Sequence, residues 1–80
     1  MPLEFRNVSV DRRIGFSTRR CRPAYINLRP GATQTIDESY MTEWPAEVKE
    51  EVAAYVENGY LTVYDTTLPG LLTVVQIIAY

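Results

Sequence analysis

Apolar and polar residues alternate through most of the first half of the chain, a pattern typical of short β-strands with one buried face. The alternation predicts strands at residues 3–10, 14–16, 24–28 and 33–37. A break in phase within the first of these predicts a bulge at Asn7. Pro30-Gly31 has the residues of a type II turn, because proline presets φ at the second position and glycine supplies the positive φ of the third. Since the connections are short, we expect antiparallel pairing.

The hydrophobic period changes between residues 45 and 58. Val48, Val52 and Val56 recur at helical spacing, which predicts one amphipathic helix. Its other positions include the charged residues Glu47, Lys49, Glu50, Glu51 and Glu57. Pro45 suits the first helical position, and Gly59 can adopt the left-handed conformation that ends a helix. Alternation resumes at residues 60–66, which we expect to form a strand, and residues 67–70 have turn composition.

Residues 71–80 carry no charge, and Thr73 and Gln76 are their only clearly polar side chains. Many of the ten are β-branched, which predicts a closing strand. Leaving its apolar side chains in water would forfeit about 10 kcal/mol, so something must cover both faces. The strand either pairs internally with residues 60–66 or is covered by a neighbouring subunit. The face expected at such an interface comprises Leu72, Val74, Gln76, Ile78 and Tyr80.

These elements predict a single domain over residues 1–80, with 71–80 as an apolar C-terminal strand at an interface. Its class is α+β, mainly β: a small antiparallel sheet, sandwich or barrel of about six short strands with one amphipathic helix at about 45–58. A single cysteine excludes an internal disulfide, and the N-terminus does not resemble a signal peptide. The expected core consists of Phe5, Ile26, Leu28, Ile36, Trp44, Val48, Val52, Val56, Leu61 and Val63.

The residues of common catalytic and metal sites are scarce. The chain has no histidine and one cysteine, and its four glycines stand apart rather than in a phosphate-binding loop. We therefore expect no enzymatic activity, cofactor or metal. Cys21 lies between two arginines that would favour its thiolate, or it is a loop residue without a role. Glu47, Glu50 and Glu51 either attract a cation or form a solvated helix face.

Charge is divided unevenly along a chain of net charge −2. Residues 1–29 carry seven arginines against two carboxylates, a balance of +5, and residues 30–80 carry one lysine against eight carboxylates, a balance of −7. The charges either meet on one solvated surface, or the basic half faces an acidic partner or nucleic acid. Arginine forks suit carboxylates and phosphates. The candidate contact arginines are Arg12, Arg13, Arg19, Arg20 and Arg22.

We expect these arginines to contact protein, such as the acidic helix of a second copy. A solvated loop and nucleic acid remain as alternatives, although only Tyr25 lies nearby to stack on a base. The apolar run at 71–80 is about half the length of a membrane-spanning helix, so no membrane partner is expected.

Three stretches carry a family resemblance: residues 5–8 (FRNV), residues 26–36 (INLRPGATQTI) and residues 57–63 (ENGYLTV). This layout resembles small structural proteins of tailed-bacteriophage virions, in which a leucine-x-proline-glycine-x-threonine turn precedes a strand and a glycine-x-leucine step leaves a helix. The resemblance covers about residues 3–65. It implies a capsid-decorating, neck or tail protein, made in the host cytoplasm, located in the virion and in contact with other copies and other structural proteins.

The sequence thus predicts a non-enzymatic structural subunit of a multi-copy assembly, a component of a tailed-phage virion. The alternative is a small intracellular binding module that recognises nucleic acid or an acidic protein through the arginine-rich loop. Self-association would favour the first function. Salt-dependent DNA binding by a monomer would favour the second.

Overall fold

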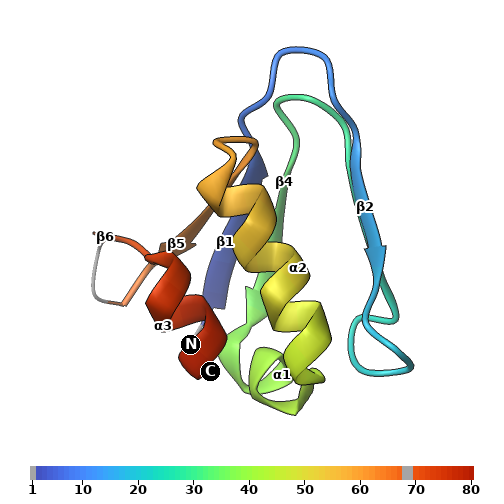
Figure 1. Ribbon diagram of the computed structural model, residues 1–80, viewed down its shortest axis with the longest axis vertical. Coiled ribbons are helices and arrows are strands. Elements are labelled where there is room, and N and C mark those ends of the chain that lie inside the picture. The colour runs from blue at the N-terminus through green and yellow to red at the C-terminus, as the bar shows by residue number, and fades with distance from the viewer. Residues whose placement is uncertain (1, 68–69) are drawn as a thin grey trace.

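The computed structural model describes residues 2–67 and 70–80 (Figure 1). Its elements are, in order, β1 (Pro2–Asn7), β2 (Ile14–Ser17), β3 (Tyr25–Leu28), β4 (Thr33–Asp37), α1 (Glu38–Glu43), α2 (Ala46–Glu57), β5 (Leu61–Asp65), β6 (Gly70–Leu71) and α3 (Val74–Ala79). The strands form a four-stranded sheet, ordered β4-β1-β5-β6, and a ribbon of β2 and β3. All described pairings are antiparallel, so the predicted α+β, mainly β class is confirmed.

Helix α2 lies between α3 on one side and the β2–β3 ribbon on the other, in front of the four-stranded sheet (Figure 1). The central strand β1 buries alternate residues, and its buried Phe5 lies opposite the buried Val63 of β5. Trp44 joins the sheet to the ribbon, because its ring meets those of Phe5 and Phe16 edge to face at 5.9 and 6.1 Å between centroids. The sheet, α2 and the ribbon therefore share one hydrophobic core.

Every predicted core residue is buried except Val56, which is half-buried. The core also contains apolar residues outside that prediction, namely Leu3, Ile14, Phe16, Met41, Ala53, Leu72 and Ile77.

Two local predictions rest on glycine and are confirmed. Gly31 has φ +81°, and the Ala32 N–H donates to the Arg29 carbonyl at 2.9 Å, which completes the turn around Pro30-Gly31. Gly59 has φ +80°, and its N–H donates to the Val56 carbonyl at 3.1 Å, as in a Schellman ending of α2. The helix begins one residue later than expected, since Pro45 is its N-cap and Ala46 its first residue.

Two strand predictions are wrong, one at each end of the chain, and one helix was missed. The first strand ends at Asn7 without a bulge, so the residues after it belong to a loop. Helix α1 was not predicted. It begins after Asp37, whose carboxylate accepts the Ser39 N–H at 2.9 Å and so caps the helix.

The predicted C-terminal strand is the largest error. Only Gly70 and Leu71 pair with β5, and the chain then forms α3. Thr73 and Gln76 make a capping box: the Thr73 N–H donates to Gln76 Oε1 at 2.8 Å, and the Gln76 N–H donates to Thr73 Oγ1 at 3.2 Å. This cap, together with complete burial of Ile77, outweighs the strand preference of the β-branched residues. The turn predicted at 67–70 includes residues 68–69, which lie outside the described residues.

Candidate interaction surfaces

The described ranges 2–67 and 70–80 contain no group of three or more histidine, cysteine or acidic side chains that could hold a metal ion. Within the same ranges, no helix combines the length and the apolar character needed to cross a membrane. A hollow of about 440 Å³ lies between α1, β5 and α3, lined by Thr42, Asp65, Leu72, Gln76, Ala79 and Tyr80.

The polar groups of this hollow have structural roles. Asp65 accepts the Thr67 N–H at 2.8 Å, and the Tyr80 hydroxyl lies 3.3 Å from a Glu38 carboxylate oxygen, to which it donates. Burial raises the pKa of Tyr80, and the carboxylates of Glu38 and Asp65 raise it further. Tyr80 therefore stays protonated, and the hydrogen bond that its hydroxyl donates to Glu38 helps to bind α3 to α1.

The five candidate arginines do not form one cluster. Arg12 and Arg13 precede β2, whereas Arg19, Arg20 and Arg22 follow it, so the two groups lie at opposite ends of the β2–β3 ribbon (Figure 1). We call residues 8–13 the Asn7 loop and residues 18–23 the arginine turn.

The arginine turn has an unusual backbone. Arg19 and Arg20 have φ of +60° and +71°, and the Cys21 N–H points to the Thr18 carbonyl at 3.4 Å, an arrangement typical of a type I′ turn. Such turns normally use asparagine and glycine, because a left-handed conformation costs other residues about 1–2 kcal/mol each. Surrounding contacts must therefore hold this turn in place.

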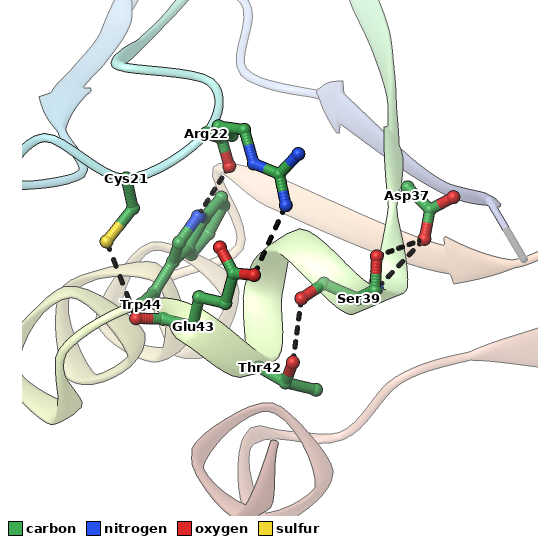
Figure 2. A network of polar contacts seen from close by, with 7 residues as sticks. All are labelled: Cys21, Arg22, Asp37, Ser39, Thr42, Glu43 and Trp44. Atoms are coloured by element: carbon green, nitrogen blue, oxygen red, sulfur yellow. Dashed lines mark hydrogen bonds and ion pairs between the residues drawn. The ribbon is translucent and has the colours of Figure 1, made fainter.

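Within the ribbon, the completely buried Thr18 donates its hydroxyl to the Pro23 carbonyl at 2.5 Å. The other contacts come from the junction of α1 and α2 (Figure 2). The Trp44 indole N–H donates to the Arg22 carbonyl at 2.9 Å, and the Cys21 thiol donates to the Glu43 carbonyl at 3.4 Å. Arg22 pairs with Glu43 at 3.2 Å, and its guanidinium lies 4.3 Å from the centre of the Tyr40 ring.

Arg19 also forms an ion pair with Glu47 at the start of α2, with 3.9 Å between its guanidinium and the carboxylate oxygen. The basic and acidic parts of the chain thus meet on one surface here, as one of the two sequence interpretations proposed.

Helix α1 presents Glu43 and Trp44 to this turn and is itself fixed at its start. Asp37 accepts the Ser39 N–H and, at 2.8 Å, the Ser39 hydroxyl, and the Thr42 hydroxyl donates to the Ser39 carbonyl at 2.7 Å (Figure 2). The Ser39 hydrogen bonds lower the pKa of Asp37, because both stabilise its ionised form.

The Asn7 loop is held from inside. The Asn7 side chain is completely buried, and its amide donates to the Arg12 carbonyl at 2.6 Å and the Leu28 carbonyl at 3.0 Å. Its oxygen accepts the Ser9 N–H at 3.0 Å and the Ser9 hydroxyl at 2.6 Å. One amide therefore ties the loop to the end of β3, using both its donor and its acceptor groups.

The outer side chains of this loop are left in solvent. Val10 is 95% exposed and Val8 is 44% exposed, although the loop backbone that carries them is held by several hydrogen bonds. The guanidinium of Arg12 lies over the Tyr60 ring, 4.7 Å from its centre, while Arg13 forms no ion pair with any described residue. Strand periodicity could not identify this feature, since it placed Val8 and Val10 in β1.

At the C-terminus, the helix changes which residues face outward. Among the five residues predicted for an interface, Leu72 is buried, Val74 and Tyr80 are half-buried, Gln76 belongs to the capping box, and Ile78 is 49% exposed. The large apolar side chains exposed in this segment are Leu71, Val75 and Ile78, which we call the C-terminal apolar patch. Thr73 and Gln76 were the sequence signal for this helix, because their spacing is that of a capping box.

Comparison with protein-family models, curated proteins and solved structures gives no match to this chain.

Proposed function

We propose that the protein is a non-enzymatic structural subunit of a multi-copy assembly, of the kind that forms tailed-bacteriophage particles. The C-terminal apolar patch is the observation that carries this proposal. Leu71 is 62% exposed, Val75 76% and Ile78 49%, on a segment without a charged side chain. Val75 and Ile78 lie three residues apart and so share a face of α3, and apolar side chains grouped on the surface of a small domain are typical of protein interfaces.

The binding-module alternative has less support. It requires the arginine turn to bind an anionic partner. Two arginines of that turn already have acidic partners within the chain, in the pairs Arg19–Glu47 and Arg22–Glu43. The virion component of the proposal rests on the sequence resemblance. Its two principal motifs, around Pro30-Gly31 and Gly59, are a turn and a helix ending in this fold.

The mass of the native protein, measured by light scattering over a range of concentrations, tests the assembly proposal. We expect the parent chain to form oligomers and Val75→Asp to remain monomeric with unchanged circular dichroism. Ala24→Asp, which adds the same charge at an exposed position far from the patch, should assemble like the parent. A parent chain that stays monomeric, or that binds DNA as a monomer in a salt-dependent manner, would contradict the proposal.

A further inference from the structure

The Asn7 loop has the properties of a preformed contact element. Its backbone is fixed by Asn7 and by the Val8 N–H, which donates to the Tyr60 carbonyl at 2.9 Å. Since this loop is already ordered, a partner that bound Val10 would not have to immobilise it. Arg13 lies beside these exposed valines and has no ion-pair partner among the described residues, so the loop offers apolar and basic groups together.

The C-terminal apolar patch has an acidic border. Successive residues of an α-helix are about 100° apart, so Glu50 and Glu57, seven residues apart, share a face of α2. Glu47 and Glu51 lie on the ribbon side of α2. Arg19 pairs with Glu47, and Arg12 and Glu51 together line a second, smaller hollow beside Tyr55 and Tyr60.

By the rotation of the helix, Glu50 and Glu57 are turned away from this ribbon side. Helix α3 packs against α2 on the side away from the ribbon (Figure 1). Both glutamates are exposed, and neither has an ion-pair partner among the described residues. The surface formed by α3 and this side of α2 thus presents apolar and acidic groups together.

These two surfaces lie far apart on one chain. The Asn7 loop is at the upper end of the molecule in Figure 1 and α3 is at its lower left, in a domain about 30 × 28 × 19 Å. One copy therefore cannot bring its own loop to its own patch. We infer that the partner of each surface is a second copy of this chain, so that the Asn7 loop of one subunit contacts the C-terminal apolar patch of the next.

Charge supports this pairing. Arg13 of one copy would face Glu50 and Glu57 of its neighbour, while Val8 and Val10 would cover Leu71, Val75 and Ile78. A two-fold contact of patch against patch would instead bring the acidic borders of both copies into one interface, and it would leave Val10 in water. The head-to-tail contact is heterologous, so repetition gives a ring or an open filament.

This inference rests on the proposed assembly function, and two complementary variants test it separately. Val10→Asp damages only the loop, and Val75→Asp damages only the patch. Each variant alone should remain monomeric, because every contact needs one loop and one patch. An equal mixture should form dimers and nothing larger, since Val75→Asp supplies an intact loop and Val10→Asp supplies an intact patch. Native mass spectrometry of isotopically distinguished chains would identify these dimers.

Each other result overturns the inference in a distinguishable way. If Val10→Asp assembles like the parent while Val75→Asp does not, the patch contacts itself or another surface, and the assembly function survives. If the mixture stays monomeric, the loop and patch do not contact each other. If the parent is monomeric at every concentration, the proposed function fails as well.

A charge reversal tests the polar part of the contact. Arg13→Glu should weaken association about tenfold at low salt, and Glu50→Arg in the same chain should restore much of the loss. Arg20→Glu, at an exposed position in the arginine turn, is the matched control and should leave association unchanged. An equal loss with Arg20→Glu, or no rescue by Glu50→Arg, would remove Arg13 and Glu50 from the interface.

Discussion

The two loops that flank β2 both carry arginines, but the fold uses their outer side chains differently. Asn7 fixes the loop before β2 from beneath, through four hydrogen bonds of one buried side chain. The turn after β2 has one inner contact, from the buried Thr18 hydroxyl to the Pro23 carbonyl, and is otherwise held by the junction of α1 and α2: Trp44 binds the Arg22 carbonyl, and Glu43 and Glu47 pair with arginine side chains of the turn. A loop supported from beneath keeps its outer side chains available, whereas a turn held by its side chains has already used them.

This difference changes which loop is the better candidate for contact. The arginine turn has the more conspicuous sequence, but two of its three arginines have acidic partners within the chain. The Asn7 loop has fewer arginines, and its preformed backbone exposes Val10 and Arg13. A preorganised backbone and outer side chains without ion-pair partners among the described residues thus make the Asn7 loop the better candidate, despite its lower density of positive charge.

Removal of the Asn7 side chain, which supports its loop from inside, should have the largest effect on stability. Asn7→Ala leaves the Arg12 and Leu28 carbonyls and Ser9 without their partner, and we expect a loss of about 2–4 kcal/mol in the free energy of unfolding. Asn27→Ala changes an exposed asparagine of β3 and should alter stability by less than about 0.5 kcal/mol. Urea unfolding measures both. Equal effects would show that the buried amide does not support the loop.

Loss of the Trp44 hydrogen bond to the arginine turn should reduce stability less. Trp44→Phe keeps an aromatic ring in the core but removes the N–H that binds the Arg22 carbonyl, so we expect a loss of about 1–2 kcal/mol. Amide exchange at Cys21 should accelerate while exchange in the Asn7 loop stays unchanged. Tyr25→Phe, which removes a polar group from an exposed ring, should change neither quantity. Unchanged exchange at Cys21 in Trp44→Phe would show that other contacts hold the turn.

The sequence predicted those elements whose cause is local. Alternation identified β1 to β5, although it extended β1 too far. The turn around Pro30-Gly31 and the end of α2 at Gly59 followed from backbone preferences of single residues. Helix α1 has only six residues, too few for a hydrophobic period to be visible. In α3, propensity favoured a strand, whereas the Thr73–Gln76 cap and the burial of Ile77 decided for a helix.

Candidate surfaces were harder to predict because they depend on tertiary contacts. Asn7 is buried because the fold brings the Arg12 and Leu28 carbonyls to it, and backbone groups carry no sequence signature. The alternation of a strand placed Ile78 with Leu72 on one face. The helix that forms instead places Ile78 with Val75 on its exposed side. The contact surfaces therefore changed with the type of secondary structure, although the apolar character of the segment was evident from sequence.

Substitutions that relieve backbone strain should stabilise the fold at the arginine turn but not at the Asn7 loop. Arg19→Asn with Arg20→Gly installs residues that prefer a type I′ turn and should stabilise the fold by about 0.5–1 kcal/mol, after the loss of the exposed Arg19–Glu47 pair. The same residue types at Arg12 and Arg13, where φ is not positive, should bring no gain. Thermal unfolding measures both pairs. A gain at both loops would indicate that loss of positive charge, not turn conformation, is responsible.

The smallest expected effect is a pH dependence of the cap of α1, the helix that presents Glu43 and Trp44 to the arginine turn. Folding lowers the pKa of Asp37 below its ordinary 3.8, so its ionised form stabilises α1 above that pH. This contribution should disappear as the pH falls through the lower, folded pKa. Asp37→Asn retains a capping group that does not titrate, so its melting temperature should decline less in acid than that of the parent.

Trp44, the only tryptophan, adjoins the end of α1 and can report this transition by fluorescence. Asp37→Ala should melt lower than Asp37→Asn at neutral pH, because alanine cannot accept the Ser39 N–H. Identical acid curves for the parent and Asp37→Asn would show that another carboxylate controls the decline. The arginine turn would then have no pH-sensitive support at Asp37. If the curves differ as expected, acid should release the arginine turn before it disturbs the Asn7 loop, whose amide does not titrate.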